Sequence, residues 1–262
     1  MFKGRKMGEQ MIGRFALAAV LFFAGSIDLA TANEKLRVAT EGAYPPFNFQ
    51  DASGQLAGFD VDIAKALCQQ MAVDCTFVAV PWTEIVQGLS DDKYDMIVAS
   101  MAFTEERAQK MEFSAPYYRS HSVLVGDAEK FQDSAPAALS GVRIAAAQDT
   151  IQAEYLQKAY GASKALLAKD QPGAQRLLLD NQADLLIGDA IELLSFLQTT
   201  EGARFGYVGD PISSEFLQSS AHITAKKGNS ALIQKVNAAL RQIKLNGVYD
   251  RINDAYFPFS IY

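Results

Sequence analysis

Residues 36–80, LRVATEGAYPPFNFQDASGQLAGFDVDIAKALCQQMAVDCTFVAV, decide the fold class. Residues 36–40 are rich in β-formers and alternate, and the glycine and two prolines of the stretch 41–47 end that strand. Apolar residues then recur close to the helical period over residues 60–71, and residues 75–80 return to a strand pattern. A strand, a helix and a strand in this order favour an α/β sheet covered by helices.

The same alternation continues along the chain. The pattern predicts further helices at 83–89, 151–160, 172–181 and 229–245. It predicts further strands at 95–98, 120–126, 142–146, 164–167 and 183–187, and the stretch 219–225 is expected to return to the first half of the fold. The second series of strands and helices repeats the first in outline, so we expect two small α/β lobes.

The two expected lobes comprise different parts of the chain. Lobe 1 is expected to comprise residues 33–120 and 219–262, and lobe 2 residues 121–218, so that two hinge crossings join them. Open α/β sheets bind ligands beyond the carboxyl ends of their strands. The ligand site is therefore expected in a cleft between the two lobes.

Residues 1–32 are typical of an export signal. Basic residues precede an apolar run over 15–27, and Ala30, Thr31 and Ala32 supply the small residues that a signal peptidase requires. The run of 13 residues is shorter than the roughly 20 that a membrane-spanning helix needs. We predict cleavage after Ala32, which leaves 230 of the 262 residues as a soluble periplasmic protein.

Charge and cysteine content narrow the class of protein. Cleavage removes four basic and two acidic residues, so the net charge of −6 becomes −8, which argues against a nucleic-acid partner. Cys68 and Cys75 favour a disulfide in an oxidising compartment, with two buried reduced thiols as the alternative. His121 and His222 lack a second ligand at zinc-site spacing, so no metal or cofactor is expected.

Four motifs carry a family resemblance: ATEGAYPPF at 39–47, GFDVDI at 58–63, YDMIVASMAFTEER at 94–107 and DLLIGD at 184–189. Together they resemble the polar amino acid-binding family of periplasmic solute-binding proteins. The branch that takes lysine, arginine, ornithine, histidine or opines is the most similar. The resemblance implies the two-lobed periplasmic binding protein fold of type II, and the membrane permease of an ABC importer as partner. We expect a monomer.

The resemblance also assigns the ends of an amino acid ligand. Arg107 matches the carboxylate clamp, since a planar guanidinium makes two parallel hydrogen bonds to a carboxylate, although the local sequence alone also fits a surface arginine. Asp189 matches the ammonium acceptor, and a helix N-cap is its alternative role. Ser100 is expected to assist through its hydroxyl, and Ala99 and Ala102 through their backbones.

The side chain of the ligand is assigned to aromatic and acidic residues. Tyr44 and Trp82, in loops after strands, resemble the aromatic walls of the family, and core packing is the alternative for both. Glu41 is expected to bind a cationic tip, unless it is a solvated loop residue. Asp60 is expected to cap the following helix or to order the binding loop.

The stretch QDTIQ at 148–152 departs from the family pattern, which places a glycine and two hydroxyl residues at this helix start. Backbone amides at Thr150 and Ile151 can still hold a carboxylate. Ile151 removes a hydroxyl, however, and Asp149 adds a negative charge. Weaker carboxylate binding or a different ligand is therefore expected.

We expect a binding protein that closes about its hinge on an amino acid, and no enzymatic activity. One alternative is a periplasmic enzyme on the same fold, similar to cyclohexadienyl dehydratases, with Glu41 or Asp189 as an acid. The other is a sensor whose loaded form docks on a receptor.

Overall fold

The computed structural model describes Met1, residues 34–217 and residues 220–262. The predicted signal peptide, its cleavage site and the predicted lobe boundary at 218/219 lie outside the described residues. The strands are β1 (Lys35–Thr40), β2 (Ala43–Tyr44), β3 (Asn48–Gln50), β4 (Leu56–Ala57), β5 (Asp74–Ala79), β6 (Met96–Ala102), β7 (Met111–Arg119), β8 (Ser122–Gly126), β9 (Arg143–Ala147), β10 (Lys164–Ala168), β11 (Leu185–Asp189), β12 (Gly206–Ile212) and β13 (Ser220–Lys226). The helices are α1 (Phe59–Met71), α2 (Trp82–Ser90), α3 (Glu105–Lys110), α4 (Ile151–Ala159), α5 (Gln171–Leu179), α6 (Ala190–Leu197), α7 (Ser230–Leu245) and α8 (Val248–Tyr256), with 3₁₀ turns at Pro136–Leu139 and Gly202–Arg204.

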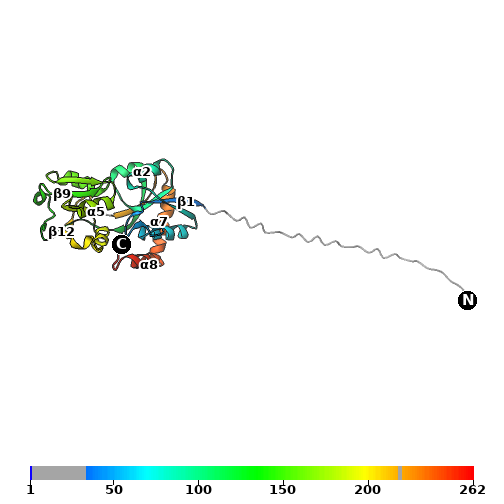
Figure 1. The fold of residues 1–262 in the computed structure, drawn as a ribbon. Helices are drawn as coiled ribbons and strands as arrows, with labels where there is room; N and C mark the ends of the chain where they lie inside the picture. Colours follow the sequence, from blue (N-terminus) through cyan, green and yellow to red (C-terminus); the bar gives the residue numbers. More distant parts are fainter. Residues whose placement is uncertain (2–33, 218–219) are drawn as a thin grey trace. The chain divides into compact units, whose positions relative to one another are not determined.

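The strands form two five-stranded sheets that have the same design. The first has the order β5-β1-β6-β13-β7 and the second the order β10-β9-β11-β8-β12. In each sheet the first three strands are parallel and the last two are joined by antiparallel pairing. In Figure 1 the second sheet and its helices, coloured green to yellow, form one group. The elements around β1, α2, α7 and α8 form another. The predicted α/β class is therefore confirmed.

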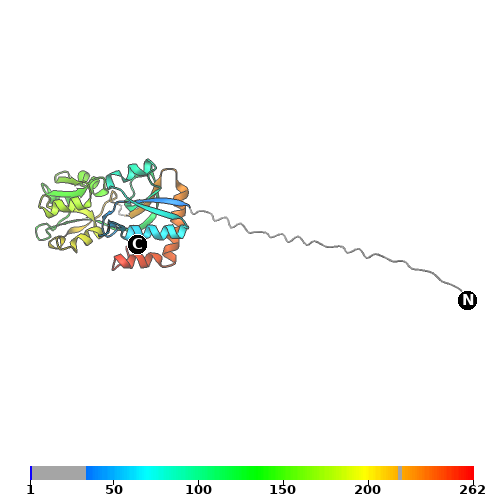
Figure 2. The same cartoon turned by 45° about the vertical axis from the view of Figure 1, so that its right-hand side comes forward.

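Both faces of each sheet are covered, because successive residues of the central strands point to opposite apolar clusters. In β1, Val38 packs with α1, α7 and α8, whereas Ala39 packs with α2. In β9, Ile144 packs toward α4 and Ala145 toward α5 and α6. Helices α1, α7 and α8 lie side by side (Figure 2).

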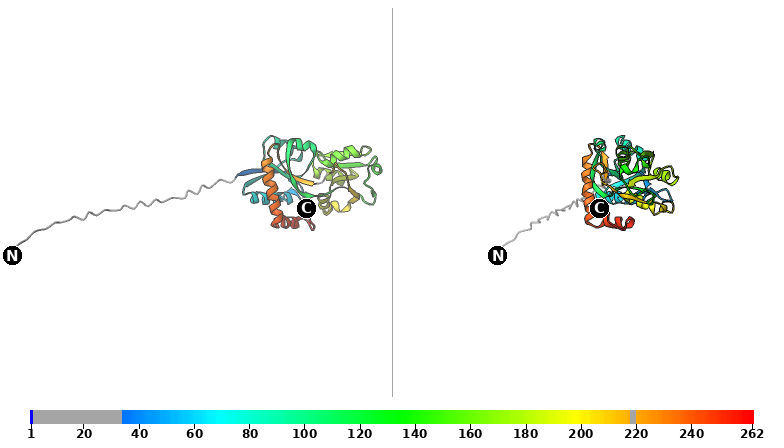
Figure 3. Two further views of the ribbon diagram at one scale, coloured as in Figure 1. Left: turned by 180° about the vertical axis from the view of Figure 1, so that it is seen from behind. Right: turned by 90° about the vertical axis from the view of Figure 1, so that its left-hand side faces the viewer.

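The chain passes twice between the sheets. The first passage is Ser120–His121, between β7 and β8, and the second lies between β12 and β13, where residues 213–217 are described. Seen from behind, the elements between these passages again form their own group (Figure 3). Residues in or just after the carboxyl ends of β1, β6, β9 and β11 line one common pocket.

Several elements differ from the sequence-based expectation. Strand β6 continues to Ala102 instead of ending at 98, so Ser100 lies inside a strand and does not follow it. The backbone of Ser100 is left-handed (φ 52°), and the register between β6 and β13 shifts around it, which indicates a bulge. Strands β7 and β12 were not predicted, because prolines interrupt their apolar pattern.

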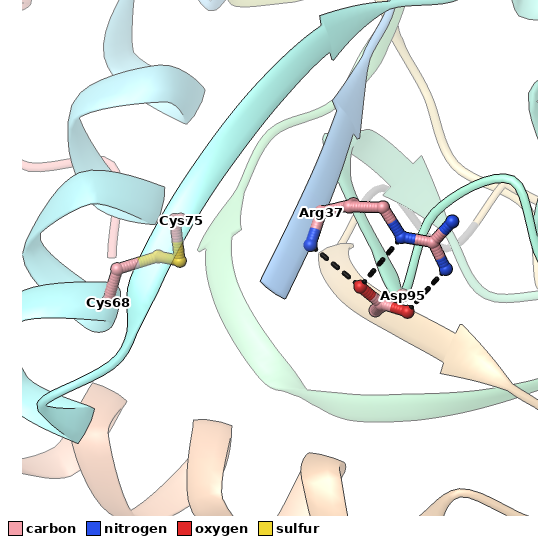
Figure 4. Close-up of a disulfide and its surroundings, with 4 residues drawn as sticks. All are labelled: Arg37, Cys68, Cys75 and Asp95. Carbon is pink, nitrogen blue, oxygen red and sulfur yellow. Dashed lines mark hydrogen bonds and ion pairs between the residues drawn. A yellow bond between two sulfur atoms is a disulfide. The ribbon is translucent and has the colours of Figure 1, made fainter. Parts of the chain in front are cut away.

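The predicted disulfide is present. Cys68 near the end of α1 is bonded to Cys75 in β5, with 6.1 Å between the Cα atoms (Figure 4). The bond lies at the amino-terminal end of the first sheet, where Arg37 of β1 makes a bidentate ion pair with Asp95. It therefore fastens a helix to a sheet edge, on the side of the lobe away from the pocket.

Removal of this disulfide is expected to lower the free energy of unfolding by about 2–3 kcal/mol, because the reduced chain regains the entropy of a short loop. The variant Cys68→Ala with Cys75→Ala should show this loss in urea denaturation, and wild-type protein in reductant should match it. A loss below about 0.5 kcal/mol would contradict the assigned role.

Candidate functional site

A pocket of about 740 Å³, including its open mouth, lies between the carboxyl ends of the two sheets. The structure brings all ten predicted ligand-binding residues to its wall: Glu41, Tyr44, Trp82, Ala99, Ser100, Ala102, Arg107, Thr150, Ile151 and Asp189. Residues of both sheets face the same space. Two predicted positions need correction, since Tyr44 lies in β2 and Trp82 is the first residue of α2, rather than in loops.

Arg107 spans the pocket from one sheet to the other. Its Nη1 donates to the Ala102 carbonyl oxygen at 2.9 Å, and its Nη2 donates to the Asp149 carbonyl oxygen at 2.7 Å. The guanidinium also lies 5.3 Å from the centre of the Trp82 ring, and Trp82 Nε1 donates to the same Asp149 oxygen at 3.2 Å. Burial lowers the pKa of Arg107 to about 10, so the group stays charged at neutral pH. Arg107 therefore lines the pocket as a cation whose guanidinium is fixed by two hydrogen bonds.

The start of α4 faces Arg107. Thr150 is the N-cap: its hydroxyl accepts from Ala153 N at 3.1 Å and donates to the Ala147 carbonyl at 2.7 Å. This hydroxyl is committed to the helix, so the groups that α4 can offer to an anion are its first backbone N–H groups. Ile151 is buried, and the side chain of Asp149 is exposed and does not line the pocket.

A buried network holds Ser100. Asp60 is fully buried and accepts from Ser100 Oγ at 2.9 Å, Asn48 Nδ2 at 2.8 Å and the Tyr117 hydroxyl at 2.6 Å. The Ser100 N–H donates to Tyr117 at 3.0 Å, and Asn48 Oδ1 accepts from the Gly42 N–H at 2.8 Å. Because the Ser100 hydroxyl donates to Asp60, its lone pairs remain to accept a hydrogen bond from a ligand.

Asp60 therefore orders the site and does not cap α1. The N-cap of α1 is Gly58, which makes no side-chain capping bond. A Cβ at this glycine (φ 115°) would lie 2.4 Å from the Phe47 carbonyl oxygen, so the close approach requires glycine. Burial raises the pKa of Asp60 to about 6, against the opposing effect of its three side-chain donors.

Asp189 both caps a helix and lines the pocket. Its Oδ1 caps α6 by accepting from the N–H groups of Ile191 at 2.9 Å and Glu192 at 3.2 Å. The residue is 7% exposed and lines the pocket. Burial raises the pKa of Asp189 to about 6.

The pocket is acidic at the end where α5 begins. Glu41 is half-buried, and burial together with the charge of Asp170 raises its pKa to about 7. Among the described residues that line the pocket, Glu41, Asp170 and Asp189 bear carboxylates and Arg107 alone bears a cation. The surplus of negative charge favours a ligand with a net positive charge.

Sequence reasoning missed several lining residues. Asp170 and Gln171 follow strand β10, so the rule that located Asp189 at a strand's carboxyl end would also have found them. Tyr118 and Ser220 lie on β7 and at the start of β13, and β7 itself was not predicted. The further lining residues are Ala147, Gln152, Ile187, Gly188 and Ala221.

In the described part of the chain, no helix is both long enough and apolar enough to cross a membrane. In the same residues, no three His, Cys, Asp or Glu side chains gather in a way that could hold a metal ion.

The family model of bacterial extracellular solute-binding proteins, family 3, matches residues 36–259. The arginine-binding periplasmic protein of Mannheimia haemolytica is 32% identical over 232 residues, which cover 87% of this chain and 93% of that protein.

Solved structures agree with this match. An ancestral arginine-binding protein bound to arginine is 29% identical, with a TM-score of 0.79 over 86% of this chain and 99% of that chain. An ancestral amino acid-binding protein, a precursor of cyclohexadienyl dehydratase, is 25% identical, with a TM-score of 0.75 over 85% of this chain and 95% of that chain. The predicted two-lobed fold of type II is therefore confirmed.

Proposed function

We propose that this chain, which belongs to the bacterial extracellular solute-binding proteins of family 3, captures a cationic amino acid in the periplasm and presents it to the permease of an ABC importer. The observation that carries the proposal is the pocket itself. At one end of the pocket, the guanidinium of Arg107 faces the start of helix α4. Carboxylates cluster at the other end. The 32% identity to an arginine-binding periplasmic protein supports a basic ligand.

The proposed binding mode uses the pocket residues by their chemistry. The ligand α-carboxylate lies between Arg107 and the first N–H groups of α4, displacing the Asp149 carbonyl from the guanidinium. The α-ammonium is held by Asp189 and by the lone pairs of Ser100. The side chain runs between Tyr44 and Trp82 toward Glu41, and Ala99 and Ala102 contribute backbone groups.

We also propose that the ligand works by closing the two lobes, 33–120 with 219–262 and 121–218. Arg107 and Ser100 belong to the first sheet and its connections, and Asp189 to the second, so one ligand contacts both. A ligand that bridges two bodies favours the closed population by its extra contacts there. The protein is proposed to act as a monomer that is exported by residues 1–32.

An elimination enzyme is the second candidate. Asp189 and Glu41 are acids whose pKa values, about 6 and about 7, suit proton transfer near neutral pH. The similarity to a precursor of cyclohexadienyl dehydratase favours the same possibility. Incubation with prephenate, followed by assay for an aromatic product, separates this candidate from a binding protein, which forms none.

The test of the proposed function is calorimetric titration of mature protein stripped of ligand. Arginine, lysine, ornithine and histidine are compared with glutamine, glutamate and opines. Tight binding of a basic member, with compaction in solution scattering, is the expected result. Binding of acidic members in preference to basic ones would refute the proposal, as would an absence of binding across the panel.

Affinity for arginine is expected to fall as the pH is lowered from 8 to 5.5. Glu41, with a pKa near 7 in the free protein, must lose its proton before it can pair with a cation, so its bound-state pKa is lower. Below pH 7 the association constant should therefore drop by up to about tenfold per pH unit. Titrations in the variant Glu41→Gln should show a weaker dependence near pH 7. Affinity that is constant or rises on acidification would contradict the prediction.

A further inference from the structure

A network of amides and a carboxyl group lies behind the pocket in the second sheet's helices. Glu192 of α6 is 1% exposed. Its Oε2 accepts from Gln171 Nε2 at 2.7 Å, and its Oε1 accepts from Gln175 Nε2 at 2.6 Å. Gln171 and Gln175 are four residues apart in α5 and so project from the same face. Each oxygen of the buried carboxyl group is thus fixed to one amide nitrogen.

Gln171 is the member of this network that reaches the pocket. Its residue is 6% exposed and lines the pocket wall. Since Glu192 holds the amide nitrogen, the carbonyl oxygen Oε1 is the atom left to face the ligand space. Within residues 34–217 and 220–262, no group donates a hydrogen bond to this oxygen. A pocket-lining acceptor without a protein donor suits a site where the ligand supplies the donor.

Gly188 makes the room that the amide occupies. A Cβ at this position of β11 would lie 2.9 Å from Gln171 Nε2 and 3.0 Å from Leu193 Cδ1. The strand therefore leaves space for Gln171 directly beside the ligand-facing Asp189. This packing gives the amide little freedom to turn away from the pocket.

Hydrogen-bond acceptors from both lobes lie near the start of α5. Helix α5 contacts β2, which follows Glu41, and Asp170 precedes Gln171 at the helix N-cap. Carboxylate oxygens and an amide oxygen are all acceptors, whereas a guanidinium offers five N–H donors and no acceptor. This end of the pocket, which is rich in acceptors, therefore suits a ligand side chain whose end carries several hydrogen-bond donors.

We propose that Gln171 determines ligand specificity by accepting a hydrogen bond, through Oε1, from the end of the ligand side chain, and that Glu192 positions it for this contact. The inference rests on the proposed function. It predicts that affinity depends on the hydrogen-bond donors at the end of the ligand side chain, and not on its charge alone.

Arginine and citrulline form the matched pair of probes, because citrulline has a carbonyl oxygen where arginine has a terminal amino group. Gln171→Met keeps the side-chain length and removes the acceptor. We expect calorimetry to show about tenfold to hundredfold weaker arginine binding, with a smaller change for citrulline. The control Gln87→Met removes an exposed amide that donates to Asp91 at 2.7 Å, and should change neither affinity. Arginine affinity within twofold of wild type in Gln171→Met would overturn the proposal.

Glu192→Gln tests the positioning role. The side-chain amide introduced at position 192 can donate to Gln171 Oε1. The Gln171 side chain can then turn its nitrogen into the pocket, so the preference for arginine over citrulline should fall at least about tenfold. If Glu192 acts through Gln171, the same change should leave this preference unaltered in a Gln171→Met background. Full additivity of the two changes would overturn the positioning role.

The results separate the two proposals. Wild-type protein that binds neither arginine nor citrulline overturns both. Wild-type protein that binds arginine tightly, while Gln171→Met keeps the wild-type affinity, overturns only the inference about Gln171. Gln171→Leu, measured in the same way, decides the matter if Gln171→Met fails to fold.

Discussion

Replacement of Arg107 by alanine is expected to weaken binding of a basic amino acid by about 30-fold to 5,000-fold, equivalent to about 2–5 kcal/mol. The guanidinium is half-buried against Trp82 and already gives one hydrogen bond to a carbonyl across the pocket. Without it, the ligand carboxylate keeps only the N–H groups of α4, which are too few to replace a bidentate charged partner.

Two further variants make this prediction specific. Arg107→Lys keeps the charge but loses the planar fork, so its binding should lie between that of wild type and alanine. Arg37→Ala removes another lobe 1 arginine that makes a bidentate ion pair, with Asp95, at the far end of β1 (Figure 4). It should leave affinity unchanged and cost less than about 1 kcal/mol of stability. Arg107→Ala protein that binds within threefold of wild type would place the carboxylate elsewhere.

Replacement of Asp60 by alanine is expected to lower the free energy of unfolding by about 3–5 kcal/mol. The carboxyl group accepts from Ser100, Asn48 and Tyr117, and its loss leaves two buried donors and one half-buried donor without a partner. The gain from removing a buried acid offsets part of this cost, as the raised pKa of Asp60 implies. Urea denaturation of ligand-free protein measures the loss.

Ligand affinity should fall about tenfold or more in the same variant, because Ser100 loses the partner that supports its left-handed backbone. Asp60→Asn retains one acceptor and should lose about half as much stability. The control is Asp62→Asn, on the same helix, whose partly exposed carboxylate bonds Tyr256 and Lys65. A loss as large as that of Asp60→Ala would show that the network around Ser100 has no special role.

The sequence by itself determined the fold class and most of the candidate site. Alternation in residues 36–80 predicts a strand, a helix and a strand because the side-chain period depends only on the local backbone. Asp189 was found for a similar reason, since it lies where an apolar strand ends. The family motifs added Arg107 and Ser100, whose types suit the two ends of an amino acid.

Only the tertiary structure decided how those residues are held. The bulge places Ser100 inside β6, and the hydrogen bonds to Asp60 and between Gln171 and Glu192 join residues 12 to 57 positions apart. Pairing of this kind depends on which polar groups are buried together, and local patterns do not contain that information. Arg107 is the clearest case, because its neighbours Glu105 and Glu106 are exposed while packing against Trp82 and Asp149 draws it into the pocket.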